Sequence, residues 1–229
     1  MNPHEAVHAI IDLIGKRIPL LTSAPDFVDR LFAAGGLARC RALLMGVHTL
    51  NESGLADVGG ALVRPLHEMW ATSLYALYGG RSAVESIAAE YSRRARQIRD
   101  AIPLDLEVPE APEGAKPMPF EHVCREVVRM LKEGGDDHAE DSMNAYYDLV
   151  FRAESLLNVH PAGGMTGHVE AKEGLLVTVP HRREPDGGEG RLLASAVLTG
   201  HLASHVFEHF GVANEDLHEL IERLRPAAL

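Results

Sequence analysis

Apolar side chains recur every three to four residues through most of this 229-residue chain, which is the spacing of amphipathic helices. The first helix begins with Asn2, Pro3 and Glu5, which are typical of a helix start. We expect an all-α protein, in which residues 1–229 form a single bundle of six to eight helices. The segments with helical spacing are 1–21, 26–52, 54–80, 82–102, 120–133, 141–160, 191–210 and 215–225.

Glycine and proline interrupt several of these segments. Gly35-Gly36 either breaks the second helix or lets another helix approach it closely. Pro65 is expected to kink the third helix or to mark its true start. The glycine pairs lie within long apolar helices, whose faces exceed what one bundle can bury, so we expect a homodimer.

Two segments lack helical spacing. Residues 103–119 contain five prolines and are predicted to form a loop, which would either cross the surface of a single bundle or separate two domains. We prefer the single bundle, because each half has only three or four helices. Residues 161–190 are a glycine-rich loop. Within it, the alternating stretch 168–180 predicts a small hairpin that turns at Glu173-Gly174.

Charge and cysteine content narrow the classes of function. The formal net charge is −11, which disfavours general binding to the phosphates of nucleic acids. The two cysteines, Cys40 and Cys124, lie far apart, as in a reduced cytoplasmic protein. No signal peptide is recognisable, and no apolar stretch reaches the roughly 20 residues of a membrane helix. We therefore expect a cytoplasmic protein with no membrane association.

The third helix carries the first candidate site. Arg64 and Glu68 lie opposite its apolar face, together with Asp57 and Tyr75. One interpretation is a solvated face with an i, i+4 ion pair, which contributes a few tenths of a kcal/mol. The other is a polar stripe that lines a pocket between helices, where Arg64 binds an anion and Glu68 orients it. His160 falls on the apolar side of its own segment, at the end of a helix. It is either a buried histidine that is hydrogen-bonded to a terminal carbonyl or an acid–base or anion-binding group that faces this stripe.

Two resemblances extend this picture. The "RPLHE" helix followed by "YDLVFRAESLLNVHP" resembles a widespread bacterial family of helical proteins that is catalogued only as a domain of unknown function. The recurring positions of that family match Arg64, Glu68, Ser155 and His160, and the resemblance implies a helical bundle with no established chemistry. "RALLMGVH" is similar to the Arg-x(4–6)-His motif of the ribonucleases in the HEPN superfamily.

A histidine stripe is the last candidate. His201, His205 and His209 are spaced by four residues and fall roughly opposite the strongest apolar face of their helix. The outer two are about 12 Å apart along the axis, too far to share one ion. We expect a partly exposed polar face whose imidazoles charge near pH 6, and we expect no metal and no cofactor.

Two functions follow from these patterns. The first is a helical protein that binds a small molecule or a protein partner in a polar pocket made by Arg64, Glu68, Ser155 and His160. The alternative is an enzyme, either a metal-independent ribonuclease of the HEPN type that uses Arg41 and His48, or an acid–base hydrolase that uses His160. No nucleophile elbow, P-loop or dinucleotide fingerprint supports a more common enzyme class.

Overall fold

The structure is a computed structural model that describes residues 3–22, 27–102, 107–147, 169–172, 175–178 and 188–228. These residues form seven α-helices, one 3-10 turn and one two-stranded hairpin, which confirms the all-α prediction. The elements in chain order are α1 (Pro3–Arg17), η1 (Ile18–Leu20), α2 (Val28–Glu52), α3 (Ala56–Ala101), α4 (Phe120–Glu133), α5 (Ala139–Tyr146), β1 (Val169–Lys172), β2 (Leu175–Thr178), α7 (Glu189–His209) and α8 (Glu215–Ala228).

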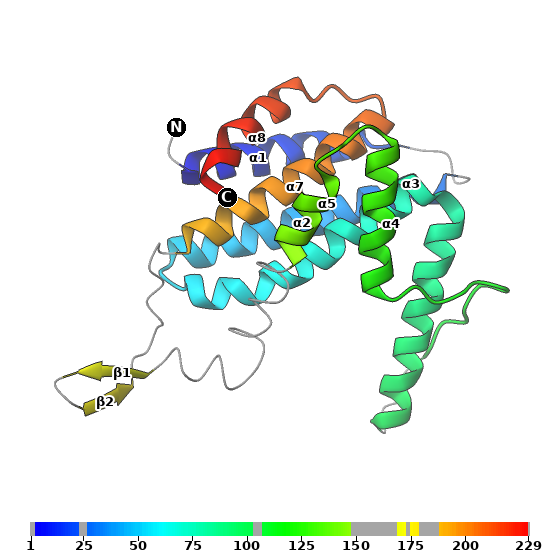
Figure 1. The fold of residues 1–229 in the computed structure, drawn as a ribbon, viewed down its shortest axis with the longest axis horizontal. Coiled ribbons are helices and arrows are strands. Elements are labelled where there is room, and N and C mark those ends of the chain that lie inside the picture. Colours follow the sequence, from blue (N-terminus) through cyan, green and yellow to red (C-terminus); the bar gives the residue numbers. More distant parts are fainter. Residues whose placement is uncertain are drawn as a thin grey trace.

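The helix α7 lies at the centre of the bundle and contacts α1, α2, α3 and α8 (Figure 1). Small residues make this position possible, because they let neighbouring helices approach the backbone closely. A Cβ atom at Gly200 would lie 2.7 Å from Cγ1 of Ile221 on α8. Buried side chains therefore surround most of the helix, where the sequence predicted one apolar face.

The long helix α3 consists of two helical halves that meet at Gly80. This glycine has φ 65° and ψ −155°, outside the helical range, and the chain turns there so that the second half extends away from the bundle (Figure 1). The predicted break between residues 80 and 82 is thus confirmed. Pro65 lies inside the first half, which begins at Ala56, so it does not mark the start of the helix.

Contacts between α2 and α3 explain one glycine in each of the other two pairs. A Cβ atom at Gly36 would lie 1.8 Å from Oγ of Ser73, so this glycine lets α2 approach α3. Gly59 faces Val47 on α2 in ordinary contact. Gly36 and Gly59 thus serve packing within one chain, whereas a Cβ atom at Gly35 would meet nothing within 4 Å, and the homodimer stays a prediction.

A single hydrophobic core draws side chains from all seven α-helices of the described residues. The residues 107–119 carry no helix, as predicted for the proline-rich loop. The hairpin predicted within 168–180 is confirmed, with β1 and β2 antiparallel and Lys172 paired with Leu175. Its expected turn residues lie outside the described residues. Within the described part of the chain, no helix combines the length and the apolar content that crossing a membrane requires.

Candidate functional site

A pocket of about 190 Å³ lies between the two halves of α3 and the start of α4. Four apolar side chains form much of its wall, and carboxylate, guanidinium, hydroxyl and phenol groups complete it. The lining residues are Glu68, Thr72, Ile87, Glu90, Tyr91, Arg94, Met118, Phe120 and Val123. The bend at Gly80 brings Glu68 and Glu90, which lie on different halves of α3, to one cavity.

The charge of the Glu90 carboxylate is neutralised by neighbouring arginines on the same helix. Its side chain is 11% exposed, and it accepts two hydrogen bonds from Arg93, at 2.8 and 2.6 Å, and one from Nε of Arg94 at 2.8 Å. The hydrogen bonds from Arg93, together with the one from Arg94, lower the pKa of Glu90 to about 2 against the opposing effect of burial. Glu90 therefore stays ionised and already has its counter-charges.

Glu68 is a more available carboxylate. Nε of Arg64 donates a long hydrogen bond of 3.3 Å to its Oε1, and the two side chains are 37% and 34% exposed. Glu68 lines the pocket, whereas Arg64 is not among the lining residues. The polar stripe thus contributes Glu68 to the lining of the pocket. Its predicted companions Asp57 and Tyr75 are buried, so a fully solvated face is the wrong description of them.

Burial makes the two thiols poor nucleophiles. Cys40 and Cys124 are free and buried, and burial raises the pKa of each to about 12. A thiol with such a pKa is protonated at neutral pH and unreactive. Both cysteines act as small apolar side chains in the core.

The histidine stripe packs against α3. Nε1 of Trp70 donates a hydrogen bond to Nδ1 of His201 at 3.3 Å, and Nε2 of His201 lies 3.2 Å from Nε2 of His205. Nδ1 of His205 lies 2.5 Å from the Tyr78 hydroxyl, and Nδ1 of His209 donates to the His205 carbonyl at 2.9 Å. The three histidines are partly exposed, as predicted, but they join two helices and do not simply face solvent.

These contacts fix the tautomers. An indole N–H can only donate, so Nδ1 of His201 must accept and its proton must be on Nε2. That proton points to Nε2 of His205, which accepts, so His205 carries its proton on Nδ1 and donates to the Tyr78 oxygen. Burial lowers the pKa of His205 to about 4, which agrees with the neutral form. The expectation that all three imidazoles charge near pH 6 is therefore wrong for His205.

Sequence reasoning did not single out His67. Its side chain is fully buried, stacked on Trp70 with ring centroids 5.5 Å apart and meeting Phe120 edge-on at 5.7 Å. Burial lowers its pKa to about 4. Phe120 also lines the pocket, so this neutral imidazole supports the pocket wall from behind.

The alternative ribonuclease pair lies between α1 and α2, away from the pocket. Nε of Arg41 donates to the carbonyl of Ile11 at 2.8 Å, and the guanidinium sits where a Cβ atom of Gly15 would be. Seven residues further along α2, or about 10 Å, His48 lies beside Glu52. Each member of the pair has its own neighbours, and the proposed catalytic role stays a prediction.

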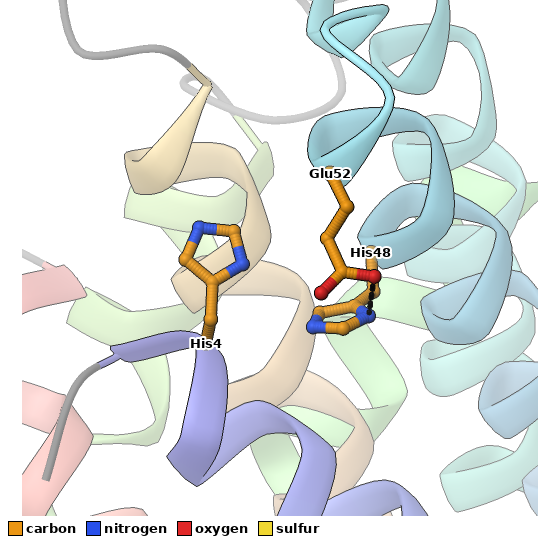
Figure 2. Close-up of side chains that lie close together, drawn as sticks. All are labelled: His4, His48 and Glu52. Atoms are coloured by element: carbon orange, nitrogen blue, oxygen red, sulfur yellow. Dashed lines mark ion pairs between the residues drawn. The ribbon is translucent and has the colours of Figure 1, made fainter.

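Three side chains of metal-ligand type gather where α1 begins and α2 ends (Figure 2). His4 comes from the first turn of α1, and His48 and Glu52 from the last turns of α2. One ligand atom from each lies within 4.8 Å of the other two. Sequence reasoning missed this group, although the four-residue spacing of His48 and Glu52 suits chelation on a helix.

The remaining predicted residues, Ser155 and His160, lie outside the described residues. Comparison of the chain with family models, with curated proteins and with solved structures finds no match. The resemblances to the helical family and to HEPN ribonucleases therefore stay predictions.

Proposed function

We propose that the protein binds a small molecule in the pocket between the two halves of α3 and the start of α4. The observation that carries the proposal is a cavity of about 190 Å³ with an apolar wall and one incompletely neutralised carboxylate, Glu68. Ligand sites usually combine an apolar lining with a few polar groups that orient the ligand. The pocket has this composition.

The volume favours a ligand of about one ring. A dry protein cavity of roughly 150 Å³ takes up benzene, so about 190 Å³ suits a single ring with a short substituent. The side chains of Ile87, Met118, Phe120 and Val123 would contact the ring.

The charges favour a head group that is cationic or donates hydrogen bonds. The pocket offers two carboxylates and one guanidinium, and Arg94 is already bound to Glu90. Glu68 accepts one long bond from Arg64, so it has lone pairs left for a ligand. The anion-binding role expected for Arg64 is less well supported, because the pocket lies on the side of Glu68.

Three ring compounds with different heads test this proposal. Benzylamine, benzyl alcohol and benzoate share one ring and differ in charge, so their dissociation constants, measured by ligand-observed NMR on the full chain, report the polarity of the pocket. We expect benzylamine to bind most tightly and benzoate most weakly. Glu68→Gln should weaken benzylamine about fivefold, or roughly 1 kcal/mol, and leave benzyl alcohol unchanged.

Two further variants locate the binding. Ile87→Trp fills the cavity and should abolish binding of all three compounds. Glu133→Gln, which changes an exposed glutamate outside the pocket lining, should leave all three dissociation constants unchanged. If none of the three compounds binds at millimolar concentration, the proposal is refuted. Preferred binding of benzoate would show instead that an arginine dominates the site.

The cellular compartment and the oligomeric state of the protein do not depend on the pocket. The two free buried thiols support the inference that the protein works in a reducing compartment, such as the cytoplasm. A homodimer could bury exposed apolar side chains, which include Tyr91 and Ile98 on the second half of α3 and Ile102 directly after it.

A further inference from the structure

We propose that His4, His48 and Glu52 form a binding site for one divalent transition-metal ion of the zinc type. The site would join the first turn of α1 to the last turns of α2 (Figure 2). It lies on other helices than the pocket between α3 and α4, and it does not depend on the function proposed for that pocket.

The antiparallel packing of α1 on α2 creates the site. Ile11 and Gly15, late in α1, contact Arg41 in the middle of α2, so the start of α1 falls beside the end of α2. The rings of His4 and His48 are 5.5 Å apart between centroids, and Glu52 follows His48 by one helical turn. Residues 44 positions apart in sequence thereby come within reach of one ion.

The distances suit a tetrahedral ion after small side-chain rotations. Zinc–ligand distances of about 2.0–2.2 Å place neighbouring ligand atoms about 3.3–3.6 Å apart. Nδ1 of His48 and Oε2 of Glu52 are already 3.5 Å apart, and the ligand atoms of the whole group lie within 4.8 Å. Glu52 is 59% exposed, so its side chain has room to turn toward the two imidazoles.

The types of ligand atom indicate the class of metal. Two imidazoles and one carboxylate are a common protein ligand set for zinc, and the fourth position is then taken by water. Calcium and magnesium prefer oxygen ligands throughout and are disfavoured here. The ring of His8 lies 6.3 Å from that of His48 and is paired with Asp12 at 3.5 Å, which places another imidazole–carboxylate pair next to the site.

His48 is the buried ligand of the site. It is 7% exposed, whereas the Glu52 side chain is largely exposed. Packing therefore holds the imidazole in place, and the exposed carboxylate can move to complete the ligand set.

Titration of the untagged full-length protein tests the site. We expect one equivalent of Zn²⁺ to bind, measured by calorimetry, and one equivalent of Co²⁺ to give the intense visible bands of a tetrahedral site. Zn²⁺ should also raise the Tm, because it binds only the folded arrangement of the two helices. Glu52→Gln and His4→Gln should each weaken Zn²⁺ about 100-fold or more, since even indirect partners of a metal contribute about 10–100-fold.

Matched controls separate this site from adventitious binding. His122→Gln and Glu219→Gln change exposed side chains of the same kinds on α4 and α8 and should leave the affinity unchanged. His48→Gln alters a buried residue, so its loss of binding counts only where circular dichroism matches that of the unaltered protein. No binding at micromolar Zn²⁺, or equal affinity in Glu52→Gln and the unaltered protein, would overturn the proposal.

Discussion

Acidification from pH 7 to pH 5 should destabilise the protein through His67 and His205. Burial lowers the pKa of each from an ordinary 6.5 to about 4. Between these two values the unfolded chain binds a proton at each histidine and the folded chain does not. The free energy of unfolding is therefore highest above about pH 6.5 and falls as the pH drops toward 4. Below pH 4 these two groups change it no further.

The magnitude follows from the two pKa values. For each histidine, the difference in proton binding between pH 7 and pH 5 costs about 2 kcal/mol of unfolding free energy. Together the two contribute about 4 kcal/mol, or a fall in Tm of roughly 10 °C for a chain of this size. Glu90 and Asp216 have lowered pKa values, so the stability that they contribute is lost at lower pH. They therefore add little to the change between pH 7 and pH 5.

Urea unfolding between pH 5 and pH 7, with EDTA present, measures this dependence. His205→Gln should reduce the loss by about 2 kcal/mol, half of what His67 and His205 contribute together, while His122→Gln, which changes an exposed histidine, should leave it unchanged. An unchanged pH dependence in His205→Gln would refute the reasoning. Long-range proton–nitrogen NMR at pH 7 should also find the proton of His201 on Nε2 and that of His205 on Nδ1.

Three further predictions concern packing, catalysis and assembly. Gly36→Ala should destabilise the protein by about 1–3 kcal/mol in urea unfolding, because its Cβ atom meets Ser73. Its neighbour Gly35, which has nothing within 4 Å, is the matched control and should gain about 0.5–1 kcal/mol on change to alanine. The ribonuclease alternative requires metal-independent cleavage of single-stranded RNA that Arg41→Ala and His48→Ala abolish, and intact RNA after incubation with the unaltered protein would dismiss it. A homodimer requires a doubled mass by light scattering at micromolar concentration, and a monomer mass would exclude it.

Helical periodicity predicted the elements well because their ends carry local signals. The segment 120–133 coincides with α4, and the glycine pair at 79–80 marks the bend in α3. Burial around α7 was not predictable in the same way. Alanine, serine and glycine fill several of its helix contacts, and these residues register weakly in a pattern of apolar and polar positions. A central helix contacted from several sides therefore looks amphipathic in sequence.

The candidate sites were predictable only where they lie on one helix. Arg64 and Glu68 are four residues apart, and the structure pairs them as expected. The opposite wall of the pocket comes from Glu90 beyond the bend and from Phe120 beyond the proline-rich loop, so its position depends on how these segments fold back. The register of one helix on another decides such contacts, and periodicity carries no information about it.

The two histidine groups differ in what their ring nitrogens already bind, and this difference decides which of them suits a metal. Both nitrogens of His201 and of His205 take part in the bonded series from Trp70 to Tyr78. An ion bound there would displace the indole or the phenol and leave a buried donor without a partner, at a cost of about 1–3 kcal/mol. At His48, Nδ1 lies 3.5 Å from the exposed carboxylate of Glu52, which can itself bind the ion. The conspicuous row of histidines thus stabilises the packing of α7 on α3, and the dispersed histidines of α1 and α2 are the better ligands.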